Sequence, residues 1–380
     1  MAFSSPKVCK LFNFCYFILV MDKKTLLSKQ KKIAKFDPSH IGLLNGQLFG
    51  LPFTNAESEV VIIPMPWEVT VSYRAGTARG PQTMLDASTQ VDFFDAGIRD
   101  AWKLGIGMEP VAAYWMRKNK ELRALAEKCI AHLERGGSPE DVKVRKYYEK
   151  INAAGAELNL WMEKASAKLL QEGKLVGVLG GEHSVSLGYM KALTKIYPSY
   201  SILHIDAHAD LRKAYEGFEY SHASIQYNAQ KMAAIEKLVV VGIRDYSQQE
   251  ADRIRDSRGR ILAFPDRDIK HRLYRGDTWK KIAADVIKPL GKNVYVSFDI
   301  DALDPALCPH TGTPVPGGLE FEQVFFMIEA LIASGRKIIG FDLCEVAPGV
   351  TDDWDSVVGV RALYRLCNLM AKSQGRFGKG

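Results

Sequence analysis

The stretch that decides the fold is His204-Ile205-Asp206-Ala207-His208-Ala209-Asp210-Leu211-Arg212, which directly follows the mostly apolar residues 200–203. It therefore lies where a buried strand is expected to end. Asp206, His208 and Asp210 alternate with Ala, and in an extended backbone residues i, i+2 and i+4 lie on one face. Carboxylates held this close repel one another unless a cation neutralises them. We predict metal ligands here; for these residues alone, the alternative is a strand end with solvated polar side chains.

The remaining sequence repeats the order strand, then helix. Expected strands cover residues 59–63, 175–179, 201–206, 238–241, 261–264, 294–298 and 337–342. Expected helices cover residues 81–88, 115–133, a segment ending near 171, then 186–196, 248–255, 278–287 and 321–333. Several of these strands are unbroken apolar runs, which favours a parallel sheet covered on both faces. We predict a single α/β domain over residues 58–380, with its functional site at the carboxyl ends of the strands.

The net charge of +7 on the 380 residues is concentrated at the N-terminus. Residues 1–36 contain eight Lys and one Asp, which account for the whole excess, so the rest of the chain is neutral overall. A neutral body does not favour nucleic-acid binding. Residues 1–57 are expected to form a basic N-terminal arm and loop.

The first twenty residues include an apolar run, residues 11–20, that follows Lys7 and Lys10. The run is too short to span a bilayer and has no small-residue cleavage site. Our hypothesis is that Met21 is the natural start and that residues 1–20 are not native. The six Cys contain no CxxC pair, which is typical of reduced thiols in a cytoplasmic protein.

Four expected strands carry acidic or imidazole side chains directly after them. Taken singly, each is ambiguous: His183 is also explained as a hydrogen-bonded core histidine, and Asp299 and Asp301 as loop-capping carboxylates. Together they predict one metal site with six ligands, namely His183, Asp206, His208, Asp210, Asp299 and Asp301. Oxygen and imidazole ligands suit Mn, Zn, Fe, Co or Ni. Two divalent cations would neutralise the four carboxylates and could share one hydroxide, which is hydrolytic chemistry. The GxSxG and GxxxxGK[ST] motifs of other enzyme classes are absent.

Three segments resemble those of the ureohydrolases, the family of arginase and agmatinase. They are Gly180-Gly181-Glu182-His183-Ser184, Asp206-Ala207-His208-Ala209-Asp210, and Ser297-Phe298-Asp299-Ile300-Asp301-Ala302-Leu303-Asp304-Pro305. Residues 74–81, 241–244 and 311–319 are also similar to the family, and the resemblance covers roughly residues 58 to 370. It implies a three-layer α/β/α fold with a mostly parallel central sheet.

The resemblance also implies roles for the site residues. One metal would be held by His183, Asp206, Asp210 and Asp299, and the other by Asp206, His208, Asp299 and Asp301. Mn²⁺ is the usual metal of the family, and Ni²⁺ is possible. The shared hydroxide attacks a guanidinium carbon, which yields urea and an amine. The catalytic residues implied are Asp210, Glu345 as the partner of the guanidinium, and His222 as the proton shuttle. Family members usually form trimers or hexamers.

The substrate is indicated by the loop after the central motif. Residues 211–217 replace the Asn-containing loop of arginases, which favours agmatine, a substrate without a carboxylate, as the source of putrescine and urea. Residues 66–73 and 345–355 differ from the usual agmatinase loops, and residues 107–150 look like an insertion.

Two tryptophans, Trp67 and Trp354, lie in the unusual loops and are predicted to bind the substrate, because an indole face attracts a cation. Bulk at these positions would favour guanidine itself, cleaved to urea and ammonia, as the alternative substrate. The other explanation is that both tryptophans are packing residues. A non-catalytic binding relative is disfavoured because all six ligands are present.

Overall fold

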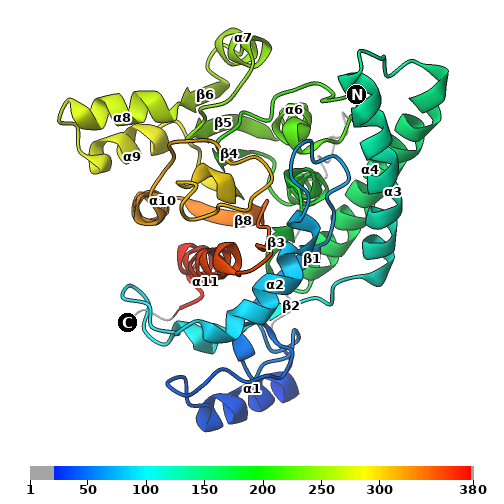
Figure 1. Ribbon diagram of the computed structural model, residues 1–380. Coiled ribbons are helices and arrows are strands. Elements are labelled where there is room, and N and C mark those ends of the chain that lie inside the picture. The colour runs from blue at the N-terminus through cyan, green and yellow to red at the C-terminus, as the bar shows by residue number, and fades with distance from the viewer. Residues whose placement is uncertain (1–20, 378–380) are drawn as a thin grey trace, which may run out of the picture.

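One eight-stranded sheet forms the centre of the computed structural model, which describes residues 21–377 (Figure 1). Its strand order is β2-β1-β3-β8-β7-β4-β5-β6, and every pairing is parallel. The strands are β1 Val60–Met65, β2 Ile106–Met108, β3 Leu175–Gly180, β4 Tyr200–Ile205, β5 Ile235–Val241, β6 Ile261–Phe264, β7 Asn293–Asp299 and β8 Lys337–Cys344.

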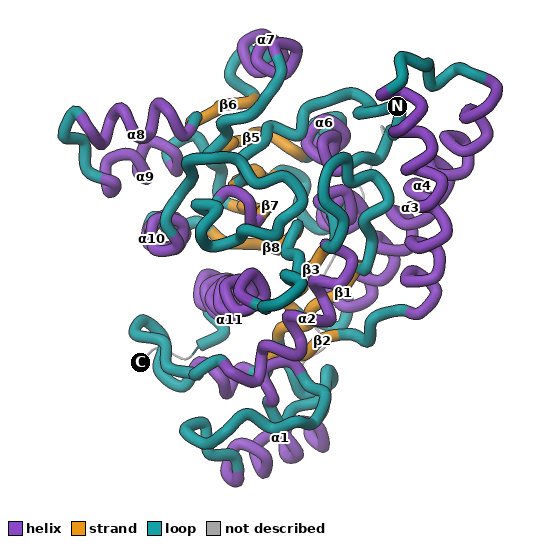
Figure 2. The backbone as a smooth tube through the Cα atoms, viewed as in Figure 1, coloured by secondary structure: helices purple, strands orange, loops and turns teal. Residues whose placement is uncertain are grey.

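Helices cover both faces of this sheet, as Figures 1 and 2 show. One face carries α3 Ala113–Glu134, α4 Val142–Gln171, α5 Leu187–Thr194 and α6 Ile225–Ala229. The other carries α2 Gly80–Ala87, α8 Asp266–Tyr274, α9 Trp279–Ile287, α10 Phe321–Ala333 and α11 Trp354–Ser373. Helix α7, Gln248–Asp256, lies beside β6 at the edge of the sheet. The predicted three-layer α/β/α fold is confirmed.

Strand β4 shows why the strands read as unbroken apolar runs. Tyr200 and Ile202 pack into the core on the α4 and α5 side, whereas Leu203 and Ile205 pack into the core on the α10 and α11 side. Successive side chains of a strand point to opposite faces, and both faces of this sheet are covered. Apolar side chains are therefore needed at nearly every position of a central strand.

The N-terminal segment is more ordered than the sequence suggested. Helix α1, Lys23–Lys35, replaces the irregular arm expected there, and the Asp22 carboxylate accepts a hydrogen bond from Thr25 N at 2.9 Å at its start. The Lys29 ammonium is buried and donates to the Leu104 carbonyl at 2.7 Å, while Lys32 pairs with Glu57 at 2.5 Å. Part of the basic excess is therefore used in contacts with the domain. The proposed non-native residues 1–20 lie outside the described part of the chain.

The thiols in the described range agree with a reduced protein. Cys129, Cys308, Cys344 and Cys367 are buried and unpaired, whereas Cys9 and Cys15 lie outside that range. Between residues 21 and 377, the structure contains no helix of sufficient length and apolarity to cross a membrane.

Candidate active site

The predicted ligands converge because four neighbouring strands, in the order β3-β8-β7-β4, are parallel. Their carboxyl ends therefore lie along one edge of the sheet. His183 follows β3, Asp206 follows β4, Asp299 ends β7 and Glu345 follows β8. Clustering of a ligand set from distant parts of the chain is thus a direct consequence of the sheet topology.

The first group of ligands surrounds His183. Its Nδ1 atom lies 3.2 Å from Asp206 Oδ2, 3.2 Å from Asp299 Oδ2 and 3.5 Å from Asp210 Oδ2. All four side chains are buried. This is the group that the family resemblance assigns to one metal.

The second group surrounds His208. Its Nδ1 atom lies 3.0 Å from Asp301 Oδ2 and 3.5 Å from Asp206 Oδ1. Asp206 therefore directs one oxygen to each group. Asp299 approaches the first group through Oδ2, while its Oδ1 accepts a hydrogen bond from Asp301 N at 2.9 Å. The structure thus brings all six predicted ligands together in two adjoining groups.

The backbone reaches this arrangement differently from the extended geometry expected for residues 206–210. Strand β4 ends at Ile205, and Asp210 has a left-handed backbone with φ of 53°. The loop is fixed by hydrogen bonds, including one from Ala207 N to Asp301 Oδ1 at 3.0 Å and one from His208 N to Asp206 Oδ1 at 2.6 Å. The prediction of one extended face is therefore wrong. The ligands meet because the loop turns, at a residue type that tolerates positive φ.

The electrostatics and donor set of this cluster fit two divalent cations. Burial, followed by the charge of a neighbouring aspartate, raises the pKa of Asp210 and that of Asp299 well above the usual range, so these carboxylates need positive charge to ionise. The Asp206 Oδ2 atom is buried and makes no hydrogen bond of good geometry with the described residues, although imidazole nitrogens of His183 and His204 lie within 3.2 Å of it. Carboxylate and imidazole donors are those that such cations prefer. Two bound cations would lower the pKa of a water molecule and so supply hydroxide at neutral pH.

A layer of polar side chains beneath the ligands was not predicted from the sequence. His183 Nε2 lies 2.8 Å from Ser297 Oγ and 3.1 Å from Asp342 Oδ1, and Tyr295 OH donates to Asp342 Oδ2 at 2.7 Å. His204 Nε2 lies 3.1 Å from Asp206 Oδ2. Partners of this kind orient metal-binding side chains. The available signal was a polar residue inside an otherwise apolar strand.

Glu345 is held at the end of β8 by its own backbone. It has φ of 63°, its N–H donates to the Gly181 carbonyl at 2.8 Å, and its Oε1 accepts a hydrogen bond from His183 N at 2.8 Å. The second carboxylate oxygen of Glu345, Oε2, lies close to Gly312: a Cβ added at Gly312 would be 3.4 Å from it. Burial, followed by the charge of Glu182, raises the pKa of Glu345 well above its usual range.

His222 opens a short 3₁₀ turn, His222–Ser224, and contacts Thr70. Its N–H donates to Thr70 Oγ1 at 3.1 Å, and its Nδ1 lies 3.3 Å from the same oxygen. Burial, and next the charge of His208, lower the pKa of His222 to about 3. The imidazole is therefore neutral at pH 7 and has an unprotonated nitrogen, but a pKa this low makes it a weaker base than a group that titrates near neutrality.

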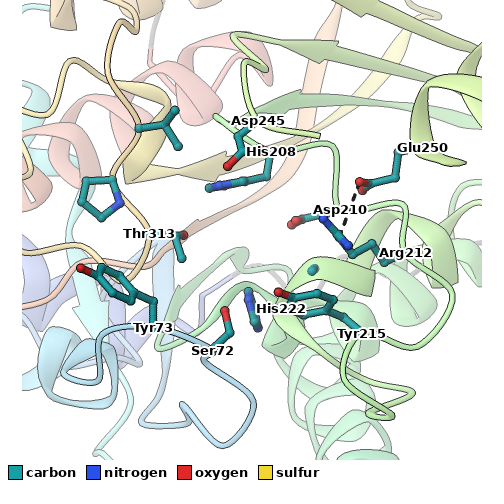
Figure 3. A pocket seen from close by; sticks show the side chains of 13 residues that line it. Ser72, Tyr73, His208, Asp210, Arg212, Tyr215, His222, Asp245, Glu250 and Thr313 are labelled. Carbon is teal, nitrogen blue, oxygen red and sulfur yellow. Dashed lines mark ion pairs between the residues drawn. The ribbon is translucent and has the colours of Figure 1, made fainter. Parts of the chain in front are cut away.

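A cavity of about 270 Å³ lies against this cluster (Figure 3). It is lined by Ser72, Tyr73, His208, Asp210, Arg212, Tyr215, His222, Ala223, Asp245, Glu250, Thr313, Pro314 and Val315. The lining therefore includes two of the six ligands and His222, whereas Glu345 is buried and is not part of the lining.

The structure places both predicted substrate-binding tryptophans outside this lining. Trp67 is 2% exposed, and its ring packs edge to face against Trp115, with centroids 5.9 Å apart. Trp354 begins α11 at the surface, where its indole N–H donates to the Ala306 carbonyl at 2.9 Å. Tyr73 and Tyr215 are the aromatic side chains that line the cavity instead.

The parallel sheet and the cluster of carboxylate and imidazole donors at its carboxyl edge fit the class of metal-dependent hydrolases. The family is defined by comparison with known proteins: the model of the Arginase family matches residues 58–367, and the chain belongs to this family. It is an agmatinase-like ureohydrolase, an enzyme that cleaves a guanidino group.

Two relatives and one solved structure illustrate the similarity. The chain is 32% identical to N(1)-aminopropylagmatine ureohydrolase of Thermus thermophilus over 296 residues, which are 77% of this chain and 84% of that protein. It is 32% identical to agmatinase of Bacillus anthracis over 293 residues, with the same two coverages of 77% and 84%. The crystal structure of agmatine ureohydrolase of Thermoplasma volcanium has a TM-score of 0.64 at 22% identity, covering 91% of this chain and 99% of that one. This last likeness concerns the fold.

Proposed function

We propose that this ureohydrolase cleaves agmatine to putrescine and urea. The observation that carries the proposal is the charge of the cavity wall outside the ligands. Agmatine has a guanidinium group at one end, an ammonium group at the other and no carboxylate. A matching site needs an acidic wall and no unpaired cation.

Asp245 supplies that negative charge. The backbones of Asp245 and His208 form an isolated parallel β-bridge, and Figure 3 shows both side chains at the cavity. Within residues 21–377 no ion pair or hydrogen bond engages its carboxylate. Arg212 is the one Lys or Arg side chain in the lining, and its charge is balanced by Glu250, with Nε 3.6 Å from Oε2. Its guanidinium also stacks on Tyr215, 4.6 Å from the ring centroid. The wall therefore suits an ammonium tail and offers no free partner for the carboxylate of arginine.

The remaining roles in this proposal belong to the residues described above. His183, Asp206, His208, Asp210, Asp299 and Asp301 would hold two divalent cations, with Mn²⁺ favoured and Ni²⁺ as the alternative. Glu345 would pair with the planar guanidinium, since a carboxylate matches its forked donors. Neutral His222 would accept a proton released by the attacking water at Nε2 and then give that proton to the leaving amine.

Urea release from a panel of compounds tests the substrate assignment. Agmatine, guanidine, arginine, 4-guanidinobutyrate and butylguanidine should be assayed with Mn²⁺ and with Ni²⁺ separately. We expect agmatine to have the highest kcat/KM. Faster turnover of guanidine would support the alternative substrate, although the tryptophans that suggested a shortened pocket lie outside the cavity. Turnover of arginine alone would contradict both assignments.

Asp245→Asn should impair agmatine selectively. We expect KM for agmatine to rise about threefold to tenfold, because an exposed ion pair contributes about 1 kcal/mol. Butylguanidine has the same guanidinium and chain length but no ammonium group, so its KM should not change. Asp256→Asn on the surface of α7 is the matched control. Equal losses with both compounds would show that Asp245 does not bind the ammonium tail.

We further propose a homo-oligomer, a trimer or hexamer, that works in the cytoplasm on a small guanidino compound without nucleic-acid or membrane partners. The neutral charge of the chain beyond residue 36 and the buried thiols support this proposal. Light scattering after size-exclusion chromatography tests the assembly.

A further inference from the structure

Thr70 lies in the loop between β1 and α2 and connects two buried groups from distant parts of the chain. Its N–H donates to Glu182 Oε2 at 2.7 Å, and its hydroxyl donates to Glu182 Oε1 at 2.9 Å. The same hydroxyl oxygen accepts a hydrogen bond from the backbone N–H of His222 at 3.1 Å. It also lies 3.3 Å from the ring nitrogen Nδ1 of His222. Thr70 and Glu182 are both buried. A continuous chain of contacts thus runs from a carboxylate through a hydroxyl to the imidazole.

The chemistry of a hydroxyl group gives this chain a direction. A hydroxyl has one proton to donate and two lone pairs that accept. When Glu182 is ionised, the Thr70 proton is directed to its carboxylate. The Thr70 oxygen then accepts from His222 Nδ1, which carries the imidazole proton. The other nitrogen, Nε2, makes no hydrogen bond with any residue between 21 and 377. In a neutral imidazole with Nδ1 protonated, Nε2 is the nitrogen that can accept a proton.

Glu182 is itself fixed in position. Its Oε1 also accepts a hydrogen bond from Ser184 Oγ at 2.6 Å, and its N–H donates to the Trp67 carbonyl at 2.7 Å. The carboxylate therefore receives three donors in a buried site, which holds both of its oxygens in place. Thr70 is anchored on a rigid group.

Helix α3 holds the loop that carries Thr70. Asn119 Oδ1 accepts a hydrogen bond from Glu68 N at 2.7 Å. Arg123, one turn further along the same face, donates to the Val69 carbonyl at 3.3 Å and to the Val71 carbonyl. Both carbonyls flank Thr70. The segment 107–150, which looked like an insertion in the sequence, thus supplies the helix that positions this loop.

We propose that Thr70, anchored on Glu182 and supported by α3, is a positioning residue that keeps the proton of His222 on Nδ1 and leaves Nε2 free for proton transfer in the cavity. The inference rests on the proposed role of His222 in the ureohydrolase reaction. Thr70 itself does not line the cavity. It therefore acts through His222 and not on the substrate.

Kinetics of two Thr70 variants provide the first test. Thr70→Val keeps the shape but removes the hydroxyl, and we expect kcat to fall about 10- to 100-fold, the usual effect of losing an orienting partner. KM should change by less than about threefold, since that partner touches no substrate. Thr70→Ser restores the hydroxyl and should recover most of kcat. Thr194→Val, which removes a hydroxyl bonded to the Lys191 carbonyl at the end of α5, is the matched control.

The proton position provides a second test that does not depend on turnover. The protein should be labelled with ¹⁵N-histidine and loaded with Zn²⁺, which is diamagnetic, and the His222 signals assigned with His222→Gln. We expect a protonated Nδ1 and an unprotonated Nε2 in the wild type, and loss of this single form in Thr70→Val at unchanged metal content. A wild-type signal with the proton on Nε2 would overturn the proposal. So would equal kcat losses in Thr70→Val and Thr70→Ser.

The two tests also separate this inference from the proposed function. If the wild type releases no urea from agmatine, the proposed substrate is wrong, but the proton position still tests Thr70. If the wild type is active and Thr70→Val retains both kcat and the His222 signals, only the positioning role is wrong.

Discussion

Asp206→Asn is expected to remove bound metal and to lower kcat/KM at least about 1,000-fold, equivalent to about 4 kcal/mol of barrier. The reason is the place of Asp206 between the two ligand groups, with Oδ2 3.2 Å from His183 Nδ1 and Oδ1 3.5 Å from His208 Nδ1. Asn supplies one carbonyl oxygen and no charge. It therefore cannot serve both groups, and the remaining carboxylates would face cations with one negative charge fewer.

Metal content, measured by mass spectrometry of the purified protein, is the primary readout for Asp206→Asn. The melting temperature with and without added Mn²⁺ is the second, because a cation that binds only the folded state stabilises it. In the variant, bound metal should be lost, and the melting temperature should no longer rise when Mn²⁺ is added. Asp256→Asn, the same change on an exposed aspartate, should behave as the wild type. Activity within about tenfold of the wild type, roughly 1.4 kcal/mol, would show that Asp206 does not connect the two groups.

The position of the ligand cluster was predictable because it depends on topology more than on side-chain packing. Apolar runs followed by Glu182-His183, by Asp206 and by Asp299 identified strand ends, and parallel strands place such ends along one edge. Neighbouring strands bring these residues to one edge, and the turn of the loop after β4 then sets the distances of 3.0 to 3.5 Å around His183 and His208. The extended backbone expected for residues 206–210 was not required for this result.

Features that depend on tertiary contacts were not predictable. The lysines of α1 indicated a solvated arm, because a sequence does not show that Lys29 reaches the Leu104 carbonyl 75 residues away. Trp67 and Trp354 are of a type that suits cation binding, but residue type does not determine which side of a loop faces a cavity. The contacts of Thr70 with Glu182 and His222 span 112 and 152 residues. No local pattern indicates such pairings.

Helix α11 was missed for a related reason. Its residues 354–373 follow an irregular loop that ends in Asp352-Asp353, and nearly all of its apolar side chains are buried against β8, α2 and α10. A helix buried on most of its surface lacks the clear polar face that makes an amphipathic helix recognisable. The strands could be found from apolar runs, whereas this helix could be found only from its packing.

Glu345→Gln is expected to preserve metal content and to lower kcat/KM for agmatine about 1,000-fold, or about 4 kcal/mol. Gln is close in shape, and its Oε1 can still accept the His183 N–H that Glu345 accepts at 2.8 Å. The backbone contacts of residue 345 with Gly181 and Thr311 do not involve the side chain and should remain. The change therefore affects mainly the Oε2 position, where an oxygen that accepts is replaced by an NH₂ group that donates.

The substitution discriminates between three roles of Glu345. If Glu345 pairs with the guanidinium, two donors face each other in Glu345→Gln, and KM and the dissociation constant for agmatine must both rise. If Glu345 acts only by fixing His183, Glu345→Gln retains that hydrogen bond, and both agmatine affinity and kcat stay near the wild-type values. If it holds the ligand cluster together, metal content falls as well. Calorimetric titration with agmatine, metal analysis and the surface control Glu172→Gln separate these cases. Normal agmatine affinity in Glu345→Gln would contradict guanidinium pairing even if turnover were lost, because a charged partner of the substrate cannot be removed without weakening the complex.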